Sequence, residues 1–386
     1  MALLFRSGNS LELLKNGEQY FPALVGAIDE ARHEVFFETY IFADDETGSL
    51  VCDALARAAV RGVEVHIILD GFGARDFAPR FGAMLGNAGA RLRVFRPKIS
   101  PLTLRRNRLR RMHRKIAVID RRIAFVGGIN ITDDYPIGGR MPPRFDYAVR
   151  VEGPLVRDVW FEAAKLWARL DWLHSRRRWR VALAPEESEP QNNGTQSATL
   201  LVRDNIRHRR DIENAYLELI AGAKGEVLIA IAYFFPGRRF RRALHDAARR
   251  GVRVVLLVQG LSDHPVMQYA SRALFRGFLD AGVEIHEYTR SELHAKVGVF
   301  DGVTASVGSS NIDPFSLVLA REANIFIRDG RFASSLRASL FEAIEASHQV
   351  PPQAWKKLGW FVRMRIWAAY GAARALMSLS GIGGWH

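Results

Sequence analysis

Cysteine is almost absent from this sequence of 386 residues, in which Cys52 is the single one. A lone cysteine excludes an intrachain disulfide, a zinc finger and a redox-active thiol pair, and it fits a reducing, intracellular location. The chain also has no uninterrupted apolar run near the ~18 residues that a membrane-spanning helix requires. Its short apolar start breaks at Arg6 and Gly8, so we expect no export signal.

Acidic residues are also few in comparison with basic ones. The 41 acidic residues are outnumbered by 55 lysines and arginines, which gives a net charge of +14 and a sequence pI near 10.3. A balance this basic favours a polyanionic partner, either nucleic acid or a membrane surface rich in anionic lipid. With 48% hydrophobic and 25% charged residues the composition is otherwise typical of a globular protein, and the chain is long enough for two domains.

Two distant blocks of the sequence follow one plan. Each has an apolar strand pattern, a helical stretch that ends in Arg-Gly-Val, an all-apolar strand, and later two short strands around a tight turn. These features lie at 31–42, 61–63, 65–69, 116–119 and 123–126 in the first block, and at 223–235, 250–252, 254–258, 297–300 and 304–307 in the second. We expect two duplicated α/β domains with mixed, mostly parallel sheets, related by a pseudo-twofold axis.

A polar, turn-rich stretch separates the two blocks and predicts a linker. The expected organisation is a first domain at 1–184, a linker at 185–198, a second domain at 199–350 and a C-terminal tail at 351–386. A long surface loop inside one domain is the alternative, which would make the repeat a coincidence.

Both blocks carry the same polar residues at the same spacing. Positions i and i+2 of a strand point to one face, so each histidine would project together with the lysine that follows it. Two such pairs, brought together across the pseudo-twofold interface, would place two imidazoles and two ammonium groups around one pocket. The first set is His113, Lys115, Asp120, Gly127, Gly128 and Asn130, and the second is His294, Lys296, Asp301, Gly308, Ser309 and Asn311.

This pocket suits a phosphodiester. Two lysines and two asparagine amides can hold the non-bridging oxygens and stabilise the charge that grows on phosphorus. One imidazole can attack phosphorus while the other protonates the leaving alcohol and later activates the incoming one. The scheme needs no metal and no cofactor. One His-x-Lys pair on a solvated strand is commonplace, so it is the duplication that indicates catalysis.

The duplicated pattern resembles the HKD motif of the phospholipase D superfamily, over about residues 10–347. Within that superfamily the segments 37–42, 127–131 and 309–316 are similar to bacterial cardiolipin synthases, particularly the shorter forms without N-terminal spanning helices. The resemblance implies that phosphatidylglycerol loses its headgroup to form a phosphatidyl-histidine, and that a second lipid's headgroup hydroxyl then accepts the phosphatidyl group to give cardiolipin. By analogy His113 is the nucleophile and His294 the acid and base, although the residues themselves do not distinguish the two.

Two pairs of carboxylates have separate expected roles. Asp120 and Asp301 belong to the catalytic signature, where we expect them to support the site by accepting hydrogen bonds from turn amides. Asp146 and Glu322 follow the motif histidines by about 30 residues, where superfamily members carry a carboxylate that orients an imidazole. Which carboxylate serves which histidine is open.

Four further residues are expected at the substrate. Asn130, Asn311 and Ser309 belong to the two motifs and are expected to bind it. Glu38 is a lone carboxylate within an apolar strand, which is costly unless it is paired. It either lines the headgroup site or pairs with an arginine, and the matching position of the second copy is Ala230.

Three basic segments of the sequence indicate the kind of partner that the protein binds. The run 105–111 adjoins the first motif and suits lipid and nucleic acid equally. The tail at 355–377 mixes tryptophan with lysine and arginine, as interfacial segments do, although a helix packed on its own domain is the alternative. The run 176–180 is either a second surface contact or an exposed helix end.

The tail favours a membrane over nucleic acid. We therefore expect phosphatidylglycerol and other anionic phospholipids as partners, and peripheral attachment to the cytoplasmic side of a bacterial inner membrane; the oligomeric state is open. A phospholipase D that uses water to release phosphatidic acid is the alternative function. A nuclease, or a catalytically silent DNA-binding relative, is disfavoured by the intact motifs and the aromatic tail.

Overall fold

The computed structural model describes residues 3–75, 77–97, 110–134, 143–175, 194–261, 265–353 and 359–379. The first copy of the repeated plan forms β1 (Arg6–Lys15), α1 (Asn16–Asp29), β2 (Glu34–Thr39), α2 (Glu46–Val60), β3 (Glu64–Asp70), α3 (Pro79–Asn87), β4 (Arg91–Phe95), β5 (Lys115–Ile119), β6 (Ile123–Gly127), β7 (Tyr147–Glu152) and α5 (Leu155–Ser175).

The second copy repeats this order. It forms β8 (Gln196–Arg203), α6 (Asp211–Gly222), β9 (Glu226–Ile231), α7 (Arg238–Arg249), β10 (Arg253–Gln259), α8 (Pro265–Asp280), β11 (Glu284–Tyr288), β12 (Lys296–Phe300), β13 (Thr304–Gly308), α9 (Pro314–Val318), β14 (Glu322–Arg328) and α10 (Gly330–Glu345). The short β15 (His348–Gln349) and α12 (Trp360–Leu379) follow.

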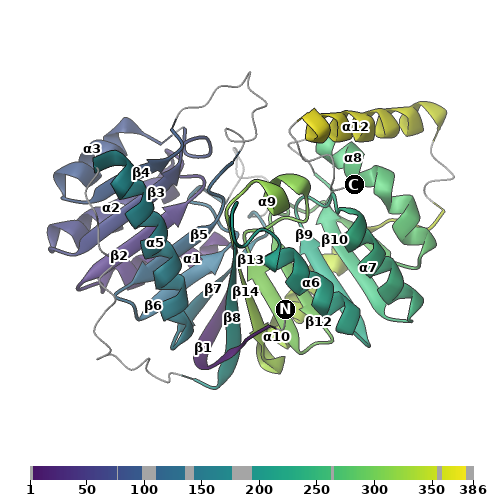
Figure 1. Cartoon of the computed structure of the whole chain (residues 1–386), viewed down its shortest axis with the longest axis horizontal. Coiled ribbons are helices and arrows are strands. Elements are labelled where there is room, and N and C mark those ends of the chain that lie inside the picture. Colours follow the sequence, from purple (N-terminus) through teal and green to yellow (C-terminus); the bar gives the residue numbers. More distant parts are fainter. Residues whose placement is uncertain are drawn as a thin grey trace.

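The two copies share one sheet, because β1 and β8 pair antiparallel where the halves meet (Figure 1). The described strands form a single sheet of fifteen, in the order β15-β11-β10-β9-β12-β13-β14-β8-β1-β7-β6-β5-β2-β3-β4. The order from β8 to β11 repeats that from β1 to β4, which is the expected pseudo-twofold relation. The duplicated α/β fold is confirmed, whereas the division into domains at 1–184 and 199–350 stays a prediction.

The expectation of mostly parallel strands is wrong. Among the described strands, only four of the fourteen pairings are parallel, namely β2–β3, β3–β4, β9–β10 and β10–β11. A crossover helix joins the two strands of each of these neighbouring pairs, namely α2, α3, α7 and α8. The motif strands are joined by tight turns instead, β5 to β6 and β12 to β13, and a tight turn makes two strands antiparallel.

Helices cover both faces of the sheet. On one face α1, α2 and α3 pack over the first half and α6, α7 and α8 over the second, each group with its own apolar cluster. On the other face α5 and α10 cover a cluster that runs through both halves, from Phe36 and Val118 to Leu257 and Leu336. Helix α5 contacts β8 and α10 contacts β1, so each long helix reaches the other half. This shared core fixes the halves relative to each other.

The C-terminal helix α12 packs on α8. Ile366 and Ala373 are buried in this contact, so the alternative of a docked C-terminal helix holds for the described part of the tail. None of the described helices is both long and apolar enough to cross a membrane. Residues 105–109 of the basic run at 105–111, the whole run at 176–180, and residues 185–193 of the expected linker lie outside the described residues.

Candidate active site

The two motif histidines lie where the halves of the chain meet. His113 precedes β5, and its backbone N–H donates to the carbonyl oxygen of Arg321 across 2.9 Å. His294 precedes β12, and its N–H donates to the carbonyl oxygen of Phe145, also across 2.9 Å. Each motif segment thus runs beside the segment that leads into the other half's carboxylate.

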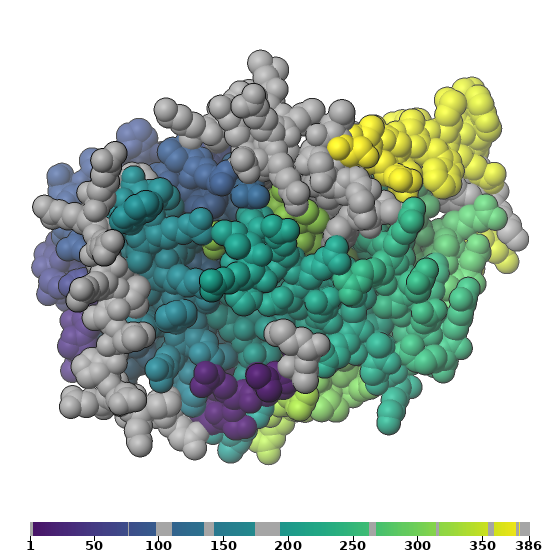
Figure 2. All heavy atoms as spheres, in the orientation of Figure 1, coloured from purple at the N-terminus to yellow at the C-terminus, as the bar shows by residue number. Residues whose placement is uncertain are grey.

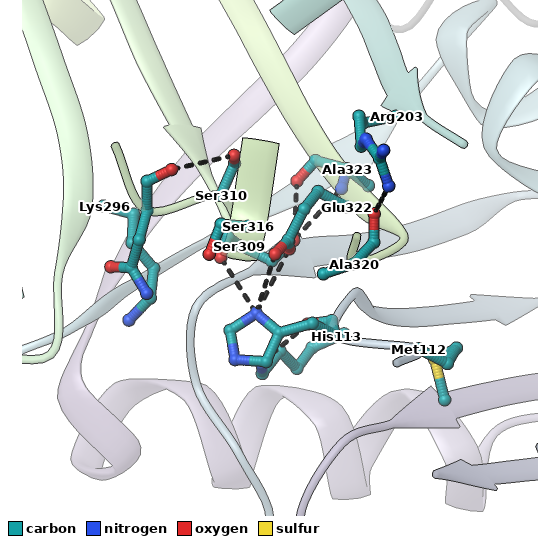
Figure 3. Close-up of polar contacts among 12 residues, drawn as sticks. Met112, His113, Arg203, Lys296, Ser309, Ser310, Ser316, Ala320, Glu322 and Ala323 are labelled. Atoms are coloured by element: carbon teal, nitrogen blue, oxygen red, sulfur yellow. Dashed lines mark hydrogen bonds and ion pairs between the residues drawn. The ribbon is translucent and has the colours of Figure 1, made fainter. Parts of the chain in front are cut away.

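These backbone contacts bring each imidazole to a carboxylate of the opposite half. Nδ1 of His294 lies 2.6 Å from Oδ2 of Asp146. Nδ1 of His113 lies 3.1 Å from one oxygen of Glu322 and 3.2 Å from the other, as Figure 3 shows. The question that the sequence left open is therefore answered by a crossed arrangement, which makes each half necessary to the other's histidine.

The motif lysines are buried beside the histidines. Nζ of Lys115 donates to the carbonyl oxygen of His113 across 2.7 Å, and Nζ of Lys296 donates to that of His294. Burial lowers the pKa of Lys115 to about 7 and that of Lys296 to about 8. Because burial disfavours the ammonium form, an incoming phosphate would favour its protonation and be held by it.

Burial also changes the ionisation of the paired groups. Burial raises the pKa of Asp146 to about 7, although the positive charge of Lys296 acts to lower it. It lowers the pKa of His113, and it lowers that of His294 well below the ordinary value, with Lys296 adding to the effect. A carboxylate with a raised pKa beside a histidine with a lowered one keeps a proton within the pair near neutral pH.

The serine of the second motif holds a carboxylate, and its expected contact with substrate stays a prediction. Ser309 is fully buried, and its hydroxyl donates to Oε2 of Glu322 across 2.5 Å. Gly128 has the matching place in the first motif, where a Cβ would lie 2.4 Å from an oxygen of Asp146. The two carboxylates are therefore held differently.

The motif asparagines are buried near the site. Oδ1 of Asn130 accepts from the backbone N–H of Ile41 across 3.3 Å and so holds the loop after β2. Oδ1 of Asn311 has no hydrogen-bond partner among the described residues. Their expected contact with substrate stays a prediction.

Glu38 does not line the headgroup site. Its carboxylate forms a buried ion pair with Arg114, with Nη2 and Oε1 2.8 Å apart. Arg114 also donates to the carbonyl oxygen of Glu162 on α5. Glu38 pairs with Ile116 in the β2–β5 ladder and so shares its face of the sheet, opposite the face of Lys115. The alternative of pairing with an arginine is therefore the right one.

The signature aspartates lie at the far end of the motif strands. Asp120 follows β5 and accepts from the backbone N–H groups of Arg32, His33 and Glu34. Asp301 follows β12 and accepts from those of residues 224–226 in the same way. The expected support of turn amides is what the structure shows, and both carboxylates lie at the ends of β5 and β12 that are farther along the chain from the motif histidines.

Sequence reasoning missed three residues near the histidines. The ring of Tyr40 packs edge-on against His113, with centroids 4.7 Å apart. Asp70 ends β3 and accepts from the backbone N–H next to His113 across 2.8 Å, and Gln259 ends β10 and accepts from the one next to His294 across 3.1 Å. Asp70 and Gln259 each follow an all-apolar strand of the repeat, so alignment of the copies could have found them.

Solved structures show the same architecture at low sequence identity. Phosphatidylserine synthase from Haemophilus influenzae Rd KW20 gives a TM-score of 0.67 at 12% identity, over 96% of this chain and 95% of that one. Polyphosphate kinase from Porphyromonas gingivalis gives 0.52 at 17% identity, over 87% of this chain and 50% of that one. The fold and the paired motifs define a protein with two phospholipase D-like domains.

Sequence comparison is more specific. A family model described as "Cardiolipin synthase, PLD-like domain" matches residues 24–135 and 216–344. Cardiolipin synthase B of Escherichia coli K12 is 42% identical over 367 residues, 93% of this chain and 87% of that protein. Cardiolipin synthase B of Salmonella typhimurium LT2 is 44% identical over 337 residues, 87% and 80%, and a cardiolipin synthase of Staphylococcus aureus Mu50 is 30% identical over 94% and 73%. The chain belongs to the cardiolipin synthase family.

Proposed function

We propose that this protein makes cardiolipin, by transferring a phosphatidyl group from phosphatidylglycerol to the headgroup hydroxyl of a second phospholipid, with release of glycerol. The observation that carries the proposal is the crossed pair of histidines and carboxylates, with two buried lysines beside them. Burial has the largest effect on the pKa of Lys115, and charges from the other half of the chain also act on it. Glu322 raises this pKa and Lys296 lowers it. One shared site for a single phosphodiester accounts for this arrangement.

In the first step Nε2 of His113 attacks the phosphorus of phosphatidylglycerol. A P–N bond forms, the P–O bond to glycerol breaks, and the glycerol oxygen takes a proton from His294. Nδ1 of His113 faces two acceptors, the carboxylate of Glu322 and the carbonyl oxygen of Ser309 at 3.2 Å. These acceptors favour a proton on Nδ1, which leaves the Nε2 lone pair for attack.

In the second step the headgroup hydroxyl of another phospholipid gives its proton to His294 as its oxygen attacks phosphorus. The P–N bond breaks and His113 is restored. The contact with Asp146 supports His294 as the group that gives and takes the proton, because that pair holds a proton near neutral pH. Lys115 and Lys296 would stabilise the charge on the non-bridging oxygens.

This function requires anionic phospholipid at a membrane surface, which the net charge of +14 favours. Peripheral attachment to the cytoplasmic side of a bacterial inner membrane is part of the proposal, as is the choice of phosphatidylglycerol as donor.

The test is incubation of the full chain with phosphatidylglycerol vesicles, with the lipids and water-soluble products read by mass spectrometry. We expect cardiolipin and glycerol in equal amounts. Phosphatidic acid with glycerol instead would identify a hydrolase, and no lipid product would reject phosphatidyl transfer from this donor. His113→Ala and His294→Ala should each abolish turnover while thermal unfolding stays close to that of the wild type. Substantial activity in either variant contradicts the shared site.

A further inference from the structure

Helix α12 carries apolar side chains on two opposite sides. At about 100° per residue, Ile366, Tyr370 and Ala373 fall on one side of the helix. This side packs on the body of the protein: Ile366 is 1% exposed, Ala373 is 7% exposed, and the ring centroid of Tyr370 lies 5.6 Å from that of Phe235. Docking on α8 therefore uses only one of the two apolar sides.

The other side is exposed. Trp360 is 67% exposed, Phe361 70%, Met364 48% and Trp367 54%. Val362, which lies near the docked side in projection, is also 39% exposed, and with it they make up five of the fifteen large hydrophobic side chains that are exposed in the described part of the chain. A third of these side chains thus lie within eight residues of one helix. Clustered exposed apolar groups mark a contact with a partner, whereas single ones do not.

The charges of α12 indicate the kind of partner. The helix has three arginines, Arg363, Arg365 and Arg374, and no aspartate or glutamate. In projection Arg365 lies at one border of the exposed apolar side and the other two lie at the opposite border. Tryptophan flanked by cations is typical of a helix in the interface of an anionic membrane. A second copy of the helix would instead bring like charges together.

The helix lies at the same edge of the sheet as the histidines. The backbone next to His113 is hydrogen-bonded to Asp70 at the end of β3, and Phe72 in the loop that follows is 38% exposed. Leu261, after β10, is 39% exposed, and Ile206, after β8, is 60% exposed. Figure 1 shows α12 at this edge, near α9, and in Figure 2 the helix stands out from the surface as a yellow ridge.

We propose that α12 and these strand-end loops form one surface that lies on a bilayer containing anionic lipid, with both histidines facing its headgroup layer. The placement of the site at the membrane rests on the proposed function, whereas the bilayer contact of α12 rests on its own residues. Lipid substrates would then reach the histidines from the headgroup layer, with their acyl chains still in the bilayer.

The test is sedimentation of the full chain with vesicles of phosphatidylcholine and phosphatidylglycerol, and with vesicles of phosphatidylcholine alone. The variant carries Trp360→Ser, Phe361→Ser and Trp367→Ser. Its matched control carries Leu4→Ser, Val60→Ser and Val303→Ser, which remove side chains that are 82%, 75% and 50% exposed at the opposite edge of the sheet.

We expect the α12 variant to bind the anionic vesicles at least tenfold more weakly than the wild type, and the control to bind as the wild type does. Wild-type binding should also be weaker on vesicles of phosphatidylcholine alone. Undiminished binding of the α12 variant, or equal loss in the control, overturns the proposal. So does a wild-type dimer that the α12 substitutions break without a change in vesicle binding, because the helix would then contact a second copy.

A second assay separates this surface from the proposed function. Short-chain phosphatidylglycerol below its micelle concentration needs no bilayer, so the α12 variant should process it at the wild-type rate while losing activity on vesicles. Loss of activity on both substrates would overturn the proposal, since α12 would then act on the site itself. If the wild type binds vesicles through α12 but makes cardiolipin from neither substrate, the proposed function fails and the membrane surface stands.

Discussion

We predict that the buried charge of Lys115 destabilises the folded protein, so removing it should raise the free energy of unfolding. Burial lowers its pKa from 10.5 to about 7. In the unfolded chain the ammonium ion is solvated, so below pH 7 folding carries the full cost of burying it. A shift of this size corresponds to about 4–5 kcal/mol, at about 1.4 kcal/mol for each pKa unit. Lys115→Met, which keeps the length and removes the charge, should therefore stabilise the protein.

Two contacts of the ammonium group reduce the gain. Nζ of Lys115 donates to the carbonyl oxygen of His113 and lies 5.3 Å from the ring centroid of Tyr40. Together such contacts contribute about 1–2 kcal/mol, which leaves an expected gain of about 3 kcal/mol at pH 6–7. The same variant should lose activity, because it removes a charge that the transition state requires.

The pH dependence gives the sharper check. The folded-state pKa of Lys115 lies below the unfolded one, so the cost is complete below pH 7 and disappears as pH rises toward 10.5. Urea unfolding of wild type and variant should differ most at pH 6 and converge by pH 10. Lys165→Met is the control, since Lys165 is half exposed and its removal should change stability little. A variant less stable than the wild type, or a difference that does not shrink with pH, would refute the reasoning.

Four other substitutions, and one second-site change, test the crossed arrangement and the fold. Asp146→Asn and Glu322→Gln should each lower kcat on phosphatidylglycerol by about 10²–10⁴-fold with little change in Tm, and an effect of only one of them would contradict the crossed pairing. Gly128→Ala should lower both Tm and activity, because the new Cβ would lie 2.4 Å from an oxygen of Asp146; a variant with wild-type Tm and rate would show that this contact relaxes freely. Glu38→Leu should cost about 3–5 kcal/mol in urea unfolding by removing the main ion-pair partner of the buried Arg114, whose next carboxylate, that of Glu162, is 3.9 Å away. Adding Arg114→Met should recover most of that loss; no recovery would mean that the charge is not the cause.

Much of the fold could be predicted because the sequence contains the same order of strand, helix and turn patterns twice. The strand, helix and turn patterns of the two copies gave the duplicated α/β architecture, and the motif spacing gave both histidines and both lysines. The strand directions were missed because β5, β6, β12 and β13 are nearly all apolar, and apolar runs of this kind resemble strands of a parallel sheet. The tight turns between them were the better signal.

The contact partners of individual side chains could not be predicted, because spacing along the sequence does not say which residues of distant segments come close in space. Asp146 and His294 are 148 residues apart, and they meet because the β1–β8 pairing and the shared core hold the two halves together. Predicting the contacts of Glu38 required the register of β2 on β5, which puts its side chain beside Ile116 rather than Lys115. Alternation along β2 alone gave two faces but not which of them holds the site.

The crossed site also gives a structural basis for the two different roles that we propose for the two copies of the motif. In one half the longer carboxylate of Glu322 is held by the hydroxyl of Ser309, and its histidine contact is 3.1–3.2 Å. In the other half Gly128 makes room for the shorter Asp146, whose histidine contact is 2.6 Å. The exchange of Gly/Asp for Ser/Glu changes how each Nδ1 is held, whereas each lysine still donates to the carbonyl oxygen of its own motif histidine. In the proposed mechanism the asymmetry that separates a nucleophile from an acid and base would therefore lie in the carboxylates behind the imidazoles, and the lysines proposed to hold the phosphate would not have to differ.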